Sequence, residues 1–144
     1  IVKTAVAIKL GLEKKLVLGN LDAYRDWGHS KDYVIAMHKI LTHKVPDDFV
    51  IASGKTYSVR QFCEKTFKKL GMNYKKYVVQ HKKYFRPGEV PFLKGDASKA
   101  RKILKWKPKY SLNNLCKEML INDLNLYGMT LNDAKKIAKK MKKK

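Results

Sequence analysis

The chain has 144 residues, of which 44% are hydrophobic, and it carries a formal net charge of +21. This length suits one domain or the remainder of a larger one, and the hydrophobic content excludes a disordered polymer. No run of eighteen apolar residues occurs, which excludes a transmembrane helix. The start of the chain also lacks the uninterrupted apolar core of a signal peptide.

The basic charge predicts adhesion to polyanions by counterion release, whatever the function of the chain. The lysines lie along the whole chain, so we interpret them as a solvated surface and expect nucleic-acid contact to be non-specific. Cys63 and Cys116 stand alone, without a CxxC motif, which indicates two reduced core thiols in a cytoplasmic protein. The four histidines are scattered and show no ligand spacing, so no metal site is expected.

Hydrophobic spacing predicts a helix over residues 1–10 that ends at Gly11. Residues 15–18 are expected to form a short strand. A polar turn over residues 19–24 then brings Arg25 back toward the end of that strand.

Ser30 is expected to cap the next helix, whose apolar positions recur at helical spacing. These positions are Tyr33, Val34, Met37, Ile40 and Leu41. After a turn at residues 45–48, the continuous apolar run at 49–52 predicts a buried strand of a parallel sheet. The neighbours that such a strand needs are not in this sequence.

A capping box at residues 58–61 predicts the start of a helix that ends at Gly71. Residues 74–80 are rich in tyrosine and valine, which predicts a strand. Residues 84–90 form an arm that contains a Pro-Gly turn.

Asp96 is expected to cap a short helix that ends near Leu104, and Ser111 to cap the helix after it. The predicted inner face of that second helix consists of Leu112, Leu115, Met119 and Leu126. Residues 133–144 are rich in lysine and predict a frayed helix or a disordered tail. Strands that alternate with helices indicate the α/β class.

The chain has only four arginines: Arg25, Arg60, Arg86 and Arg101. Where lysine fills ordinary surface positions, an arginine indicates a need for the planar, bidentate guanidinium group. Such a group matches the oxygens of a diphosphate, so Arg25 and Arg86 are candidates for a diphosphate clamp. Glu89 lies three residues after Arg86, where its carboxylate is placed to accept from ribose hydroxyls or a guanine N–H edge.

Local sequence leaves other interpretations of these residues open. Arg25 and Asp26 are placed to form a surface pair beside an aromatic ring, and Arg86 and Glu89 are placed to pair with each other. The remaining two arginines lie on predicted helix faces and are interpreted as structural.

Five segments, in order, resemble the GDP-mannose 4,6-dehydratases, which are extended short-chain dehydrogenases. They are RDWGHSKDYV at residues 25–34, DFVIASG at 48–54, YSVRQF at 57–62, YFRPGEV at 84–90 and LKWKP at 104–108. The family counterparts read RDWGHAKDYV, DFVIATG, SVREF, YFRPxEV and LxWKP. The resemblance covers roughly residues 1–127.

The resemblance implies an α/β fold: the C-terminal part of an extended short-chain dehydrogenase, with the last Rossmann elements and a small α/β substrate-binding domain. It implies that Arg25 and Arg86 contact the diphosphate of GDP-mannose and that Glu89 helps hold the nucleoside. The intact enzyme would be an NADP-dependent lyase, a cytoplasmic homodimer or homotetramer. It would convert GDP-mannose to GDP-4-keto-6-deoxymannose on the route to GDP-fucose.

The cofactor-binding half of such an enzyme is missing from this sequence. No two glycines lie closer than Gly88 and Gly95, so the glycine-rich loop that binds a dinucleotide pyrophosphate is absent. No tyrosine has a lysine four residues later, as the family's catalytic pair requires. We therefore expect no catalytic, cofactor-binding or metal-binding residue in this sequence. NADP is expected to bind to the missing N-terminal part, and the segment alone is expected to be inactive.

The predicted organisation has a C-terminal substrate-binding part at residues 1–127, in which residues 29–52 pack on the missing Rossmann sheet. Residues 128–144 form a lysine-rich tail. Two alternatives remain: another sugar-nucleotide epimerase or dehydratase of the same family, or a basic nucleic-acid-binding module.

Overall fold

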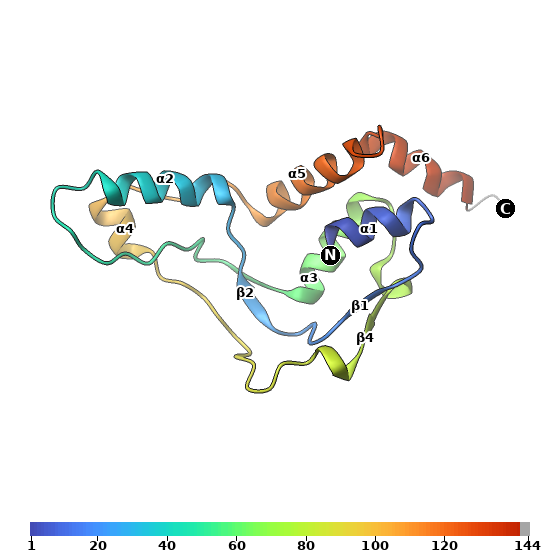
Figure 1. The fold of residues 1–144 in the computed structure, drawn as a ribbon, viewed down its shortest axis with the longest axis horizontal. Helices are drawn as coiled ribbons and strands as arrows, with labels where there is room; N and C mark the ends of the chain where they lie inside the picture. Colours follow the sequence, from blue (N-terminus) through green and yellow to red (C-terminus); the bar gives the residue numbers. More distant parts are fainter. Residues whose placement is uncertain (142–144) are drawn as a thin grey trace.

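A computed structural model describes residues 1–141 of the chain. Its helices and strands form a larger and a smaller packed unit, with β2 between them (Figure 1). In chain order the elements are α1 (Val2–Lys9), β1 (Leu16–Leu18), β2 (Tyr24–Asp26), α2 (Ser30–Leu41), β3 (Thr56–Ser58), α3 (Val59–Lys69), β4 (Val78–Gln80), α4 (Ser98–Ile103), α5 (Leu112–Asn125) and α6 (Leu131–Met141), with single 3-10 turns at Tyr74–Lys76 and Lys82–Tyr84.

The larger unit holds the main hydrophobic core. Helices α1, α3 and α5 pack on one another, and β1 pairs with β4 in parallel. The largest fully buried apolar side chains are Val6, Phe67, Leu70, Leu120 and Leu124. Both cysteines are free and lie in this core, as the sequence predicted.

Side-chain caps explain where the helices of the larger unit begin. Ser58 and Gln61 form the predicted capping box of α3, and Ser111 forms a second box with Asn114 at the start of α5. Helix α3 ends before Gly71, which has a φ of 71°, a conformation that suits a residue without a side chain.

The smaller unit consists of α2, α4 and the segments beside them. Its buried residues are Ala36, Ala97, Ala100, Leu104 and Trp106. The indole Nε1 of Trp106 donates to the carbonyl of Asp32 at 2.9 Å. The Asp32 carboxylate, only 1% exposed, accepts from the backbone N–H groups of Lys109 and Tyr110 at 3.0 Å each. These bonds tie α2 to the segment that leads into α5.

The prediction of a buried strand at residues 49–52 is wrong. Within residues 1–141 this segment belongs to no strand and has no pairing partner, and Val50 is 56% exposed. A run of apolar residues forms a sheet strand only where neighbouring strands supply backbone hydrogen bonds. The Ser30 cap is also off by one residue, because the His29 side chain accepts the Lys31 N–H and caps α2.

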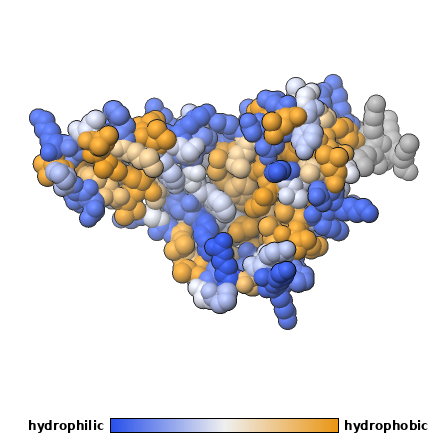
Figure 2. Space-filling view, viewed as in Figure 1, coloured by the Kyte–Doolittle hydropathy of each residue, from blue (hydrophilic) through white to orange (hydrophobic). Residues whose placement is uncertain are grey.

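Helix α2 leaves much of its apolar side uncovered. Val34 is 62% exposed, Met37 64% and Leu41 84%. Figure 2 shows hydrophobic residues at the surface of the smaller unit. Apolar residues at helical spacing predicted the helix, and in the described chain nothing covers this part of it.

Two further expectations need correction. Only residues 78–80 of the predicted strand are a strand, because Asn73 caps a 3-10 turn before it. The buried row of α5 is Leu112, Cys116, Leu120 and Leu124, because successive steps of four residues from the capped start fall on one face. The predicted Met119 and Leu126 are 40% and 77% exposed.

The C-terminal segment forms a helix, the first of the two forms that the sequence left open. Helix α6 starts at Leu131 after a reciprocal cap between Thr130 and Asp133, and it packs on α1 and α5 with Ala134 fully buried. Residues 142–144 of the predicted tail lie outside the described residues. Within residues 1–141, no helix is long and apolar enough to cross a membrane, and no three His, Cys, Asp or Glu side chains group around a possible metal position.

Candidate sugar-nucleotide site

The predicted arm at residues 84–90 continues into residues 91–93, which lie along β2. Tyr24 donates its N–H to the carbonyl of Pro91 at 2.8 Å and accepts the N–H of Leu93 at 3.1 Å. The rings of Tyr24 and Phe92 lie 5.9 Å apart between centroids. On β2 the next residue, Arg25, is in register with Tyr57 of β3. Strand β2 therefore lies between β3, with which it pairs, and the segment that contains the arm.

Arg25 joins β2 to the arm through its guanidinium group. Its Nη2 contacts Oε1 of Glu89 at 2.8 Å, and its Nη1 donates to the carbonyls of Val90 at 2.9 Å and Tyr24 at 2.7 Å. The Arg25 side chain is 25% exposed and that of Glu89 19%. These contacts use three of the five guanidinium N–H groups. Within residues 1–141, the Nε–H and one Nη2–H of Arg25 have no partner.

The two local pairings that the sequence left open are not formed. Asp26 does not pair with Arg25, because its carboxylate accepts the backbone N–H groups of Ser53 and Gly54 at 2.8 Å each. Glu89 pairs with Arg25 rather than with Arg86. Asp26 thereby fixes the loop before β3, and Glu89 fixes the side chain of Arg25.

Arg86 stands apart from this pair. It is exposed and, within the described part of the chain, its side chain makes no hydrogen bond or ion pair. The turn beyond it contains Gly88, whose φ is 67°. The structure thus joins Arg25 to Glu89 and presents Arg86 on the same arm with its donors unused.

The sequence model of the family described as GDP-mannose 4,6 dehydratase matches residues 1–119. The chain belongs to this family. GDP-mannose 4,6 dehydratase 1 of Arabidopsis thaliana is 49% identical over 119 residues, which cover 83% of this chain and 33% of that protein. The chain therefore spans about a third of the length of this curated relative.

Solved structures agree on the fold. An RMD from Pseudomonas aeruginosa, solved in complex with NADPH, matches 85% of this chain and 40% of that chain with a TM-score of 0.75 at 21% identity. A dTDP-glucose 4,6-dehydratase from Bacillus anthracis, solved with NAD, matches 81% and 36% with a TM-score of 0.67 at 23% identity. The predicted fold class, a part of an extended short-chain dehydrogenase, is confirmed.

The other two arginines of this family member make surface contacts. Arg60 donates to both carboxylate oxygens of Asp22, from Nε at 2.8 Å and from Nη2 at 2.9 Å. These hydrogen bonds lower the pKa of Asp22 and raise that of Arg60. Arg101 lies 3.6 Å from Asp96 within the α4 region. Neither contact involves Arg25 or the arm.

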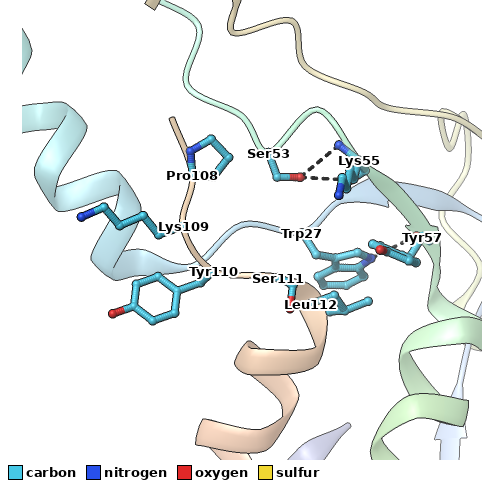
Figure 3. Close-up of a pocket in the computed structure, with 9 residues that line it drawn as sticks. All are labelled: Trp27, Ser53, Lys55, Tyr57, Pro108, Lys109, Tyr110, Ser111 and Leu112. Atoms are coloured by element: carbon cyan, nitrogen blue, oxygen red, sulfur yellow. Dashed lines mark hydrogen bonds between the residues drawn. The ribbon is translucent and has the colours of Figure 1, made fainter. Parts of the chain in front are cut away.

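A hollow that the sequence did not indicate lies between β3 and the start of α5. It has a volume of about 180 Å³. Its lining residues are Trp27, Ser53, Lys55, Tyr57, Pro108, Lys109, Tyr110, Ser111 and Leu112 (Figure 3). It contains none of the three predicted site residues, and it is smaller than the usual 300–1,000 Å³ of a ligand pocket. We assign it no role.

Sequence reasoning missed the residues that seat the arm. Tyr24 and Val90 hold it through backbone carbonyl and N–H groups, and such contacts leave no mark in side-chain identity. The buried His29 was also missed. Its Nε2 lies 3.3 Å from Glu118 of α5, and its ring stacks on Tyr110 with centroids 4.4 Å apart. That group connects the start of α2 to α5 and includes no residue of the arm.

Proposed function

We propose that this chain supplies the GDP-sugar contacts of a GDP-mannose 4,6-dehydratase, with Arg25 and Arg86 on the diphosphate and Glu89 at the nucleoside. The observation that carries the proposal is the contact between Arg25 of β2 and Glu89 of the arm at 2.8 Å. It brings together two of the three residues that the resemblance assigns to one ligand, although 64 positions separate them in the sequence.

The remaining hydrogen-bonding capacity of these residues suits a sugar nucleotide. Arg25 keeps two N–H groups for phosphate oxygens while Glu89 and two carbonyls hold its side chain in place. The exposed Arg86 offers its full set of donors, and guanidinium groups bind phosphate oxygens through paired, charge-assisted hydrogen bonds. The second carboxylate oxygen of Glu89 accepts no hydrogen bond within residues 1–141, which leaves it for a ribose hydroxyl or a guanine N–H.

The family match supports a proposal for the activity of the whole enzyme, which needs residues that this sequence does not contain. We propose that this activity is the conversion of GDP-mannose to GDP-4-keto-6-deoxymannose by an NADP-dependent lyase, in the cytoplasm, on the route to GDP-fucose. The residues present do not fit NADP: neither β1 nor β2 leads through a glycine-rich loop into a helix. We propose that another part of the enzyme binds the cofactor and holds the catalytic groups, and that this chain alone is inactive.

The uncovered side of the smaller unit is where that other part would pack. Val34, Met37 and Leu41 expose apolar surface on α2, and residues 49–52 run without a strand partner in the described chain. A Rossmann sheet would cover the apolar surface of α2 and would supply a strand that pairs with residues 49–52. We therefore propose that residues 29–52 pack on the Rossmann sheet. They belong to a substrate-binding part at residues 1–127, which a lysine-rich tail at residues 128–144 follows. We expect the intact enzyme to be a dimer or tetramer.

Calorimetric titration of the 144-residue chain with GDP tests the ligand assignment. We expect Arg25→Ala and Arg86→Ala each to weaken GDP binding by about tenfold to a hundredfold, the usual cost of a hydrogen bond to a charged group. Glu89→Gln should weaken it less, because the amide oxygen still accepts from Arg25. Arg101→Ala is the matched control, since within residues 1–141 the ion pair and hydrogen bond of its side chain go to Asp96 and Ser98 and not to the arm.

Competing ligands separate this function from its alternatives. Preference for UDP or dTDP over GDP would contradict the guanine assignment and favour a related sugar-nucleotide enzyme. Binding that falls steeply with salt and is equally weakened by Arg101→Ala would indicate general attraction of anions to a chain of charge +21. Either result would refute a specific GDP site at Arg25 and Arg86.

A further inference from the structure

One residue in the turn between β1 and β2 has no room for a side chain, because the root of the arm lies directly against it. A methyl carbon at Gly19 would overlap the carbonyl oxygen of Tyr84 and would lie 2.6 Å from its carbonyl carbon and 3.2 Å from the nitrogen of Phe85. All three are backbone atoms, which no change of rotamer can move. The φ of Gly19 is not in the left-handed region, so the turn itself does not require glycine.

The root of the arm is tied to this turn by hydrogen bonds. Strand β4 leads into the arm, and just beyond it His81 donates its N–H to the carbonyl of Leu18 at 2.9 Å. The side chain of Gln80 donates to the carbonyl of Gly19 at 3.2 Å. Tyr84, which touches Gly19, is two residues before Arg86. The position of Arg86 therefore depends on how closely the chain passes residue 19.

The C-terminal end of the arm and the residues that follow it are held by Tyr24 and Arg25, which lie five and six residues after Gly19. Tyr24 exchanges backbone hydrogen bonds with Pro91 and Leu93, and Arg25 holds Glu89. Residues 84–93 are thus attached at both ends to one short stretch of chain, from Gly19 to Arg25. A shift at the Gly19 end changes where the arm starts, while the Tyr24 end fixes where it finishes.

We propose that Gly19 is a positioning residue of the diphosphate site: its lack of a side chain lets the arm pass close enough for Arg86 and Arg25 to share one diphosphate. This inference rests on the proposed function of the arm. Carbon atoms in contact lie about 3.5 Å apart, so a methyl group at residue 19 must push the backbone of Tyr84 away by roughly 1 Å. A displacement of that size is enough to misalign a bidentate contact.

The test uses Gly19→Ala in the full chain, with Gly28→Ala as the matched control. A methyl group at Gly28 would meet the side chain of Tyr33, which can turn away, and not the arm. We expect Gly19→Ala to weaken GDP binding by about tenfold and Gly28→Ala by less than about twofold. Because Gly19 acts through Arg86, Gly19→Ala should add almost nothing in an Arg86→Ala background.

A measurement without ligand separates this inference from the proposed function. In Gly19→Ala, amide hydrogen exchange at Tyr24 and Leu93 should speed up severalfold while that of Phe67 in α3 stays unchanged. If Gly19→Ala changes the exchange rates in this way but the unmodified chain does not bind GDP, the proposed function is wrong. The inference that Gly19 positions the arm would still hold.

Unchanged exchange and unchanged GDP affinity in Gly19→Ala would overturn the inference, and so would losses that add fully to those of Arg86→Ala. Should Gly19→Ala fail to fold, Gln80→Ala removes the hydrogen bond to the Gly19 carbonyl without adding bulk. It is then expected to speed exchange at Leu93 by about twofold. No change at Leu93 in this variant would count against the inference.

Discussion

The substitution Asp32→Ala should be among the most destabilising in this chain, although Asp32 makes none of its hydrogen bonds to the arm. The Asp32 carboxylate is 1% exposed and accepts two backbone N–H groups, those of Lys109 and Tyr110, at 3.0 Å each. Loss of a hydrogen bond to a charged group costs about 1.5–3 kcal/mol, and both donors here are partly accessible to water. We therefore expect a loss of about 2–4 kcal/mol, a large share of the 5–15 kcal/mol typical of a folded domain.

Urea denaturation, followed by the fluorescence of the buried Trp106, measures this loss. Asp32→Asn keeps one acceptor oxygen and should cost about half as much as Asp32→Ala. Asp47→Ala, which removes an exposed carboxylate paired with Lys99, is the matched control and should leave the midpoint close to that of the unmodified chain. A loss below about 0.5 kcal/mol for Asp32→Ala would refute the reasoning.

Three further predictions concern other parts of the molecule. Burial raises the pKa of Cys63 to about 11 and also raises that of Cys116, so neither thiol should react with a thiol reagent at pH 8 until urea unfolds the chain; rapid labelling of the folded chain would contradict this. Hydrogen bonds from Arg60 lower the folded-state pKa of Asp22, so the stability that this pair contributes is present above the unfolded pKa, near 4, and is lost as the pH falls through the folded value. As the pH is lowered from about 5 to about 2, the free energy of unfolding should therefore fall less in Arg60→Ala than in the unmodified chain. Equal falls in the two chains would show that the Arg60–Asp22 pair does not contribute this stability. Met37→Ser should change the free energy of unfolding by less than about 0.5 kcal/mol because Met37 is 64% exposed, whereas a larger loss would show that α2 is covered in this chain.

Local signals predicted the helices well because their determinants are close together in the sequence. Ser58 and Gln61 are three residues apart, and their capping box formed as expected. The row of buried residues on α5 was harder to predict, because several leucines compete for the inner face. Packing against α1 and α3 selected Cys116 and Leu120 in place of Met119.

Strand pairing and the site itself depended on contacts between distant residues. The apolar run at 49–52 predicted a strand that the structure does not form, because no strand within residues 1–141 pairs with it. The resemblance named Arg25 and Glu89 for one ligand, yet nothing local indicated that they touch each other. The close contact between Gly19 and the arm could not be predicted from the sequence, since it is made to the backbone of Tyr84, 65 residues further along the chain.

The most direct test of the GDP site uses the fact that the chain has only four arginines. In a chain labelled with nitrogen-15 at arginine, each guanidinium gives a separate side-chain signal that can be followed by NMR as GDP is added. The account predicts that the signals of Arg25 and Arg86 shift together and reach saturation, while those of Arg60 and Arg101 stay in place. Equal shifts at all four arginines, or none at Arg25 and Arg86, would contradict it.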